Sequence, residues 1–294
     1  MSLGGNPFVI LDAAVAQERE QWIDLWHRWP DHEVWAHPGY AQLFSRPSDR
    51  VLCASLDEIS GGILFPLIIR PIGAEPWAPQ DQTSCDLVSP YGYGGPFGWG
   101  TTDTTLFWKH FDEWAAEINA VSLFTRFLGS SDQPIPFVGE TTAKCPSVVV
   151  SLNQAAEGVW QGYDRAIRNN IKQAEGAGVT VVSDPRCERL EEFLTVYNAT
   201  MNRLGALSTY YYPKSFFKKL FLQFPDQCVL FHALHQNSVV SSELVLLSPR
   251  SIYSFLGGTL PEGLDTRAHQ LLRHAINMWG QERGKERVIL GGGY

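Results

Sequence analysis

The chain has 294 residues, of which 44% are hydrophobic and 18% charged, and its formal net charge is −8 at pH 7. This apolar content is enough to bury a sizeable core, which excludes an intrinsically disordered chain. The acidic balance argues against a protein that coats DNA or RNA. The length suits one large domain or two of ordinary size. No apolar run reaches the roughly 18 residues of a membrane span, so we expect none.

The N-terminus lacks the basic start and apolar core of a secretory signal. The cysteines are scattered and never spaced C-x-x-C, which argues against a disulfide framework and against a zinc site. We therefore expect free thiols in the reducing cytoplasm, with no metal and no tightly bound cofactor. The cysteines are Cys53, Cys85, Cys145, Cys187 and Cys228.

The first half of the chain alternates helical and extended patterns. Its first helix has Asp12 as the expected cap. A short strand later runs into the glycine-rich stretch 86–96. In chain order the patterns predict helices over 13–29 and 38–44, strands over 51–56 and 63–72, the strand and turn over 86–96, a helix over 104–119 and a strand over 121–127.

The second half repeats this order of helix, hairpin, strand, glycine turn, helix and strand, which indicates an internal duplication. We predict an α/β (α+β) fold of two similar units, residues 1–150 and 151–294. Asp265 or Thr266 is the expected cap of the last helix. The predicted elements are helices over 163–177, 188–203, 213–224 and 266–283 and strands over 179–183, 228–234, 239–247, 251–256 and 287–290.

Several catalytic signatures are absent from the sequence. It contains no G-x-x-x-x-G-K-[ST] phosphate loop, no H-E-x-x-H zinc helix and no G-x-S-x-G nucleophile elbow. The spacing of the histidines also does not suit metal ligation. A reaction in this protein would therefore depend on positioning and on backbone hydrogen-bond donors.

Several stretches resemble one family, and they are residues 86–96, 163–182, 196–213, 253–259 and 290–293. The sequence DLVSPYGYGGP of residues 86–96 resembles the Asp-x-x-Ser-Pro-Tyr-Gly-Tyr-Gly-Gly stretch of FemAB-like proteins. The basic stretch 163–182 and YSFLGGT of residues 253–259 fit the same template. The family consists of two GNAT-type acyltransferase folds in tandem, so the resemblance implies two GNAT-like units with mixed sheets flanked by helices.

The resemblance also implies an activity, that of an N-acyltransferase acting on an amine acceptor. In the best-known members the acceptor is a peptidoglycan precursor of the cell envelope and the donor is aminoacyl-tRNA, which makes tRNA a candidate partner. Related groups use acyl-CoA. This sequence has neither the long helical arm linked to tRNA nor an R-x-x-G-x-G/A pyrophosphate loop, so both donors stay open. The family also continues through another strand, so we expect the sequence to stop one strand short at Tyr294.

A second hypothesis is a non-catalytic protein of the same fold. It would bind a glycan or peptidoglycan fragment through its aromatic side chains, since the chain has 10 Trp and 10 Tyr.

Basic residues recur at i, i+3 and i+7 over 163–177 and share one helix face. They are candidates to hold a substrate phosphate, and by resemblance Arg168 is the best match to the family's phosphate contact. The alternative is an ordinary solvated basic face. These residues are Arg165, Arg168 and Lys172.

Polar and aromatic residues lie where a strand meets the glycine-rich turn. Such loop groups often bind ligands, although a tight turn that packs tyrosine rings would explain them equally well. These candidate substrate contacts are Asp86, Ser89, Tyr91 and Tyr93.

Glu243 lies in the middle of an apolar strand and is the candidate general base for an amine, unless it faces solvent or pairs with an arginine. The adjacent strand carries residues whose backbone N–H groups could hold an acyl carbonyl. His269, in the first turn of its helix, could approach a phosphate, or be a plain surface residue. The candidates on the adjacent strand, whose N–H groups could hold the acyl carbonyl, are Tyr253, Gly257, Gly258 and Thr259.

Overall fold

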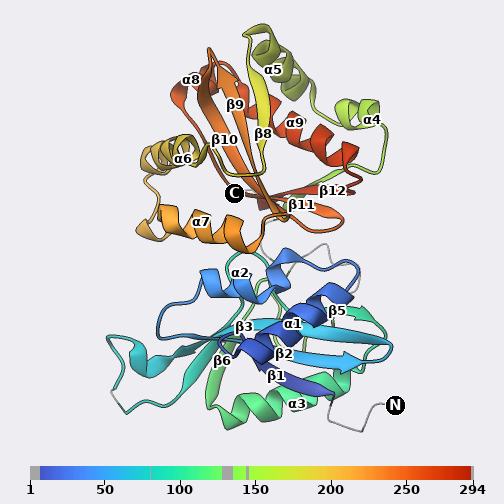
Figure 1. Ribbon diagram of the computed structural model, residues 1–294, viewed down its shortest axis with the longest axis vertical. Coiled ribbons are helices and arrows are strands. Elements are labelled where there is room, and N and C mark those ends of the chain that lie inside the picture. Colours follow the sequence, from blue (N-terminus) through green and yellow to red (C-terminus); the bar gives the residue numbers. More distant parts are fainter. Residues whose placement is uncertain (1–6, 80, 128–134, 144–145, 293–294) are drawn as a thin grey trace. The chain divides into compact units, whose positions relative to one another are not determined.

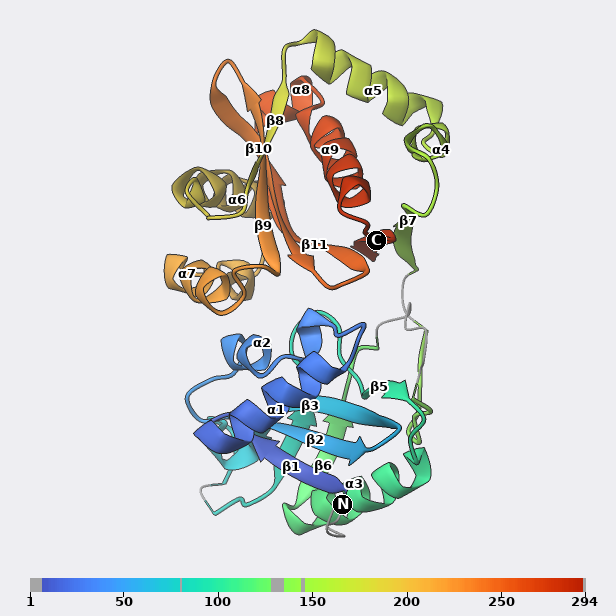
Figure 2. The same ribbon diagram turned by 45° about the vertical axis from the view of Figure 1, so that its right-hand side comes forward.

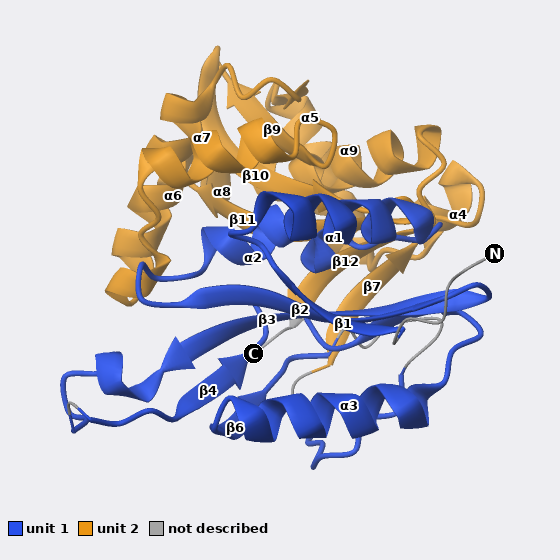
Figure 3. Cartoon of the chain, turned by 60° about the horizontal axis from the view of Figure 1, so that its bottom comes forward, with its two compact units in different colours: residues 1–143 blue, residues 144–294 orange. Residues whose placement is uncertain are grey.

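The computed structural model describes residues 7–79, 81–127, 135–143 and 146–292. The chain divides into two compact units, Met1–Ala143 and Lys144–Tyr294 (Figure 3). This division precedes the expected boundary at residue 150, because Ser147–Ser151 forms an edge strand of the second sheet. Each unit has a mixed sheet with helices on both faces (Figure 1).

The first unit is built on a sheet in the order β1-β2-β3-β4-β6, in which β4 and β6 are parallel and β5 pairs with β3. Helix α3 covers one face of the sheet, and α1 and α2 cover the other (Figure 3). The elements are β1 (Phe8–Asp12), α1 (Ala16–Arg28), α2 (Pro38–Leu43), β2 (Arg50–Glu58), β3 (Gly61–Pro71), β4 (Cys85–Val88), β5 (Phe97–Gly100), α3 (Thr104–Glu117) and β6 (Ala120–Phe124).

The second unit has the strand order β7-β12-β11-β10-β9-β8, with β11 and β12 parallel. Its helices α6 and α7 cover one face, and α9 covers the other, followed outward by α5 (Figure 2). The elements are β7 (Ser147–Ser151), α4 (Ala156–Gln161), α5 (Arg165–Gly176), β8 (Thr180–Asp184), α6 (Leu190–Leu204), α7 (Lys214–Gln223), β9 (Cys228–His235), β10 (Ser238–Leu247), β11 (Ser251–Thr259), α8 (Pro261–Asp265), α9 (Ala268–Glu282) and β12 (Arg287–Gly292).

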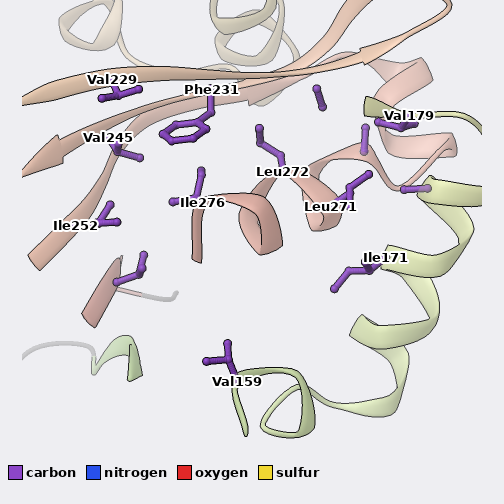
Figure 4. Close-up of a cluster of buried hydrophobic side chains, with 14 of the residues drawn as sticks. Val159, Ile171, Val179, Val229, Phe231, Val245, Ile252, Leu271, Leu272 and Ile276 are labelled. Carbon is purple, nitrogen blue, oxygen red and sulfur yellow. The ribbon is translucent and has the colours of Figure 1, made fainter. Parts of the chain in front are cut away.

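The core of the second unit lies between its sheet and α9. Phe231 of β9 and Val245 of β10 point toward Ile276 of α9, and Ile171 of α5 closes the layer beyond it (Figure 4). All four side chains are buried. Burial of this apolar surface fixes α9, and with it the start of α9, against the sheet.

The two units repeat one topology. The orders β1-β2-β3-β4-β6 and β8-β9-β10-β11-β12 match strand for strand, and in each the last pair is parallel and the others antiparallel. Two helices follow the first strand, and the connection between the last two strands contains α3 in the first unit and α8 and α9 in the second. The predicted duplication is therefore present, and β7 is an addition to the second copy.

Two predicted helix caps are wrong. Asp12 ends β1 and accepts a hydrogen bond from the Ala14 N–H, while α1 begins four residues later with no side-chain cap. Asp265 and Thr266 close the short helix α8, and the N-cap of α9 is Arg267 in the left-handed region, with φ of 60°. The sequence patterns also missed β1, β5, β7, α4 and α8, which are short or have irregular polarity.

Candidate active site

Strands β11 and β12 pair for three residues and then diverge. The pairs join Ser251–Tyr253 to Arg287–Ile289, whereas β11 continues to Thr259. The register of β11 against β10 shifts at the same level, so that Phe255 is an extra residue on β11. Bulges of this kind commonly adjoin active sites because they redirect backbone groups. From residue 254 onward, β11 therefore has an outer edge that β12 does not pair.

The direction of the backbone groups on this edge follows from two hydrogen bonds. The Leu260 N–H donates to the Val240 carbonyl, toward β10. The Thr259 N–H donates to Thr200 Oγ1 over 2.9 Å, away from β10. Since successive residues of a strand alternate, Gly257 presents its N–H on the same outer side as Thr259. The Thr259 N–H is therefore already used, and the role of the Gly257 N–H as a donor to an acyl oxygen stays a prediction.

The two glycines of β11 permit close packing against neighbouring elements. A Cβ at Gly258 would lie 2.5 Å from Thr200 Oγ1 and 2.7 Å from the Val196 carbonyl oxygen. A Cβ at Gly257 would lie 2.9 Å from the Ser242 carbonyl oxygen. All three distances are shorter than real side chains allow, so these glycines bring α6 and β10 against β11.

Thr259 is held from three directions. Its carbonyl accepts hydrogen bonds from Thr200 Oγ1 at 3.3 Å and from Arg203 Nη2 at 3.4 Å, and its hydroxyl lies 2.8 Å from that of Ser241. Tyr253 is buried in the core. Of the four β11 residues predicted from the sequence, Gly257 retains an outward N–H, and the other three have structural contacts: Tyr253 is in the core, Gly258 lies against α6, and Thr259 is hydrogen-bonded. Thr200 was missed because its contact with Thr259 spans 59 residues.

Glu243 lies on β10 directly opposite Gly257. Its side chain is 9% exposed, and its Oε2 lies 3.8 Å from Arg273 Nε of α9. Residues 243, 245 and 247 alternate with their neighbours and share the face that α9 covers. The carboxylate is therefore nearly buried beside the start of the opened edge. A carboxylate can accept the proton of an amine, and this role of Glu243 stays a prediction.

His269 lies in the first turn of α9. Burial lowers the pKa of this imidazole, and the nearby Arg273 and Arg267 lower it further. Its Nδ1 is buried without a hydrogen-bond partner among the described residues. The ring is therefore neutral near pH 7 and can act as a hydrogen-bonding group rather than as a cation.

The basic face of α5 contacts α4. Arg168 Nη1 donates to the Gln161 carbonyl at 3.1 Å and also to the Tyr163 carbonyl. Lys172 Nζ lies 5.9 Å from the centre of the Trp160 ring. Arg168 thus satisfies a carbonyl at the end of α4, as basic residues near helix C-termini often do. Arg165 is exposed. The described contacts support a structural role for Arg168 and Lys172, and a phosphate clamp stays a prediction.

Two of the four candidate substrate contacts in the first unit lie at the same cavity. Ser89 Oγ accepts a hydrogen bond from the Arg126 N–H, and the Tyr91 ring lies 5.5 Å from that of Phe44. The Tyr93 ring instead packs edge-on against buried Trp35, 5.3 Å away. Ser89 and Tyr91 line one cavity, whereas Asp86 forms an ion pair with Arg70 on the adjacent strand.

One chain of contacts imitates a catalytic triad. Ser242 Oγ lies 2.8 Å from His232 Nδ1, and His232 Nε2 lies 3.6 Å from Asp184 Oδ2. All three residues are buried, and burial lowers the pKa of His232 despite the nearby carboxylate. Asp184 instead accepts hydrogen bonds from the N–H groups of Glu188 and Arg189. A substrate cannot reach this serine, so the arrangement is structural.

The described part of the chain contains no cluster of three or more potential metal ligands and no helix of the length and apolarity needed to cross a membrane. Four of the cysteines are free thiols in the structure, and Cys145 lies outside the described residues.

A comparison with known families finds a match for most of the second unit. Residues 162–294 match the acetyltransferase (GNAT) domain family. The matched segment makes up most of the C-terminal unit. It contains β10, β11, α9 and β12, and therefore the opened strand pair and Glu243. No curated protein matches the chain at the sequence level.

Solved structures extend the similarity to the whole fold. FemX superposes with a TM-score of 0.67 at 11% identity, covering 94% of this chain and 87% of FemX. A conserved protein of unknown function from Bacteroides thetaiotaomicron gives 0.62 at 10% identity, covering 97% and 90%. The C-terminal domain of an Agrobacterium fabrum protein assigned as a lysylphosphatidylglycerol synthetase gives 0.54 at 12%, covering 93% and 79%. These similarities confirm the predicted FemAB-like fold.

Proposed function

We propose that the chain is an N-acyltransferase whose chemistry takes place in the GNAT domain. The observation that carries the proposal is the opening of the β11–β12 pair after Tyr253, with the outward N–H of Gly257 directly opposite Glu243. A backbone donor fixed in a sheet needs no reorganisation when negative charge develops on an acyl oxygen. The nearly buried carboxylate supplies a proton acceptor at the same level of the sheet.

In the proposed reaction, an acceptor amine attacks the acyl carbon of an activated ester or thioester. The carbonyl oxygen becomes an oxyanion and accepts the Gly257 N–H. Glu243 takes the proton of the attacking amine, directly or through one water. The carbon–oxygen or carbon–sulfur bond of the donor then breaks, and the leaving group departs as an alkoxide or thiolate that is protonated in turn. No covalent enzyme intermediate is required.

The donor is an acyl-CoA or an aminoacyl-tRNA, and both carry phosphates. The start of α9 supports either one. Its N-cap is a basic residue, Arg267, and within the described part of the chain the side chain of this residue makes no capping hydrogen bond. Backbone N–H groups at a helix start favour anions. His269 and Arg273 lie in the first two turns of the same helix.

The acceptor we propose is an amine on a small molecule or a cell-envelope precursor, as the family resemblance implies. We place the reaction in the cytoplasm, where both donors are made. The free thiols of the described cysteines fit a reducing compartment.

The test is transfer of a labelled acyl group by the full chain. Acetyl-CoA and a mixture of labelled aminoacyl-tRNAs are each offered with a panel of amines that includes a peptidoglycan precursor. We expect transfer from one donor class, and we expect Glu243→Gln to lower kcat by a factor on the order of 10² to 10⁴. The matched control is Glu282→Gln, a carboxylate at the exposed end of α9 with a side chain 75% exposed.

Two outcomes would contradict the proposal. One is full activity in the Glu243→Gln protein, which would exclude this carboxylate as the base. The other is binding of a glycan or peptidoglycan fragment without transfer from either donor, which would favour the non-catalytic alternative.

A further inference from the structure

A cavity of about 240 Å³ lies in the first unit, on the face of the sheet opposite α3. Ile68 of β3 and Val88 of β4 are direct cross-strand partners and form its apolar floor. Phe44, which follows α2, and Tyr91 of the glycine-rich loop add aromatic walls. The cavity is large enough for a ring or a branched chain, with one polar group beside it.

Two arginines border this apolar floor. Arg70 lies two residues after Ile68, so it shares the same face of β3, and its cross-strand partner is Asp86. Arg70 Nε donates to Asp86 Oδ1 over 2.8 Å and Arg70 Nη2 to Oδ2 over 2.6 Å. Arg46 is held in the same manner by Asp49, with Glu75 on its Nη1. The carboxylates therefore fix the orientation of both guanidinium groups.

The exposed parts of these ion pairs are the guanidinium groups. The side chains of Arg46 and Arg70 are 44% and 41% exposed, whereas that of Asp49 is 2% and that of Asp86 is 25% exposed. A guanidinium has five N–H donors, of which Asp86 uses two on Arg70. The two N–H groups of Nη1 and the second one of Nη2 have no acceptor among the described residues. They form the second, outward edge of a planar fork.

We propose that this cavity binds a small molecule that carries a carboxylate or a phosphate next to an apolar group. The anion accepts hydrogen bonds from the outward edge of Arg70, which matches the two oxygens of such a group. The apolar part covers Ile68 and Val88 between the rings of Phe44 and Tyr91. Asp86 is then a positioning residue that orients Arg70, not the direct substrate contact expected from the sequence.

This proposal does not depend on the proposed acyl transfer. The residues of the cavity all belong to the first unit, whereas the opened strand pair belongs to the second. The three carboxylates around the two arginines limit the affinity for anions, so simple probes should bind weakly and bind less at high salt. Failure of acyl transfer would leave this proposal unaffected, and the reverse also holds.

The test is a titration of the full chain with benzoate, phenyl phosphate and neutral benzamide, followed through isotope-labelled methyl groups of Ile68 and Val88 by NMR. We expect both anions to shift these two signals and to bind roughly tenfold or more tightly than benzamide. The ratio of the two anion affinities tells whether a carboxylate or a phosphate is preferred. Shifts confined to other methyl groups, or equal affinities for benzoate and benzamide, would overturn the proposal.

Variants identify the arginine edge. Arg70→Gln should weaken both anions roughly tenfold or more without weakening benzamide. Arg70→Lys keeps the charge but lacks the planar edge, so it should weaken the binding of both anions less than Arg70→Gln does. Arg28→Gln is the matched control, because Arg28 is also an exposed arginine paired with an aspartate of this unit, Asp57. Anion binding that survives both changes at Arg70, or that is lost equally with Arg28→Gln, would refute the assignment.

Discussion

The two units share a topology and differ at their parallel strand pair. In the first unit, β4 and β6 stay together beyond their four paired residues, because the Ser89 N–H donates to the Phe124 carbonyl and the Gly94 N–H to the Arg126 carbonyl. A further bridge joins Gly94 to Phe127. In the second unit, β11 and β12 separate after Tyr253 and leave the Gly257 edge open.

The N-termini of the helices α3 and α9, which lie between the strands of these two pairs, also differ. Asp103 caps α3, and its Oδ1 accepts the Leu106 N–H over 2.9 Å. The corresponding helix α9 has Arg267 at its N-cap and no side-chain cap. A carboxylate at a helix start occupies the place that an anion would take, whereas an uncapped start beside a basic residue can receive one. The duplication thus supplies two copies of one framework, and the open strand edge and the uncapped helix start, on which the proposed acyl transfer depends, both belong to the second copy.

The largest expected effect concerns acid stability of the first unit. Burial lowers the pKa of His37 from 6.5 to about 3, with Arg19, His27 and His32 adding to it. The unfolded chain therefore takes up the proton first, so stability is full above about pH 6.5 and falls as the pH drops toward 3. The slope approaches 1.4 kcal/mol per pH unit, or about 2.5 kcal/mol between pH 6 and pH 4.

Denaturant unfolding followed by tryptophan fluorescence measures this loss, since eight of the ten tryptophans lie in the first unit. His37→Asn is the control variant. It keeps an acceptor for the Gly39 N–H but removes the titrating group. An unchanged pH dependence in this variant would show that another group causes the acid sensitivity.

The next effect concerns the packing of α6 against the opened strand of the second unit. Gly258→Ala places a methyl group 2.5 Å from Thr200 Oγ1, and we expect a loss of about 2 kcal/mol in unfolding free energy together with slower acyl transfer. Gly176→Ala at the end of α5 is the matched control, because nothing lies within 4 Å of its Cβ. Denaturation followed by circular dichroism gives the unfolding free energy of each of the two variants. Equal stability of the two variants would mean that α6 moves away at little cost.

The smallest effect concerns the cap of α3. Asp103→Ala removes the acceptor of the Leu106 N–H and should lower the stability of the first unit by about 1 kcal/mol. Asp103→Asn keeps an acceptor oxygen and should lose less. Neither change should alter acyl transfer, since the cap belongs to the unit without the opened pair. A marked loss of transfer in Asp103→Ala would break the assignment of the chemistry to the second unit.

Much of the fold could be predicted from the sequence, because periodicity is a local property. The alternating strands and amphipathic helices gave both copies of the repeat, and the family resemblance gave the GNAT-like arrangement. Glu243 could be selected because a carboxylate inside an apolar strand is costly and conspicuous. The residues that cap the helices were less predictable. The short helix α8 takes up Asp265 and Thr266, so Arg267 becomes the N-cap of α9.

The roles of several candidates could not be predicted, because they depend on partners distant in the sequence. Arg168 has the residue type of a phosphate ligand, yet it donates to carbonyl groups at the end of α4. Asp86 resembled a ligand contact until the β3–β4 register placed Arg70 beside it. Residue type and spacing state what a side chain can bind, and the fold decides which partner reaches it first.

The sequence by itself therefore determined the duplicated α/β framework and its helices and strands, since local hydrophobic periodicity encodes them. The tertiary structure decided which of the two parallel pairs stays closed and which opens. That choice rests on single contacts between separate segments, such as Gly94 with Phe127 in one unit and Thr200 with Thr259 in the other. Such contacts form only after the chain has folded back on itself, so no local pattern records them.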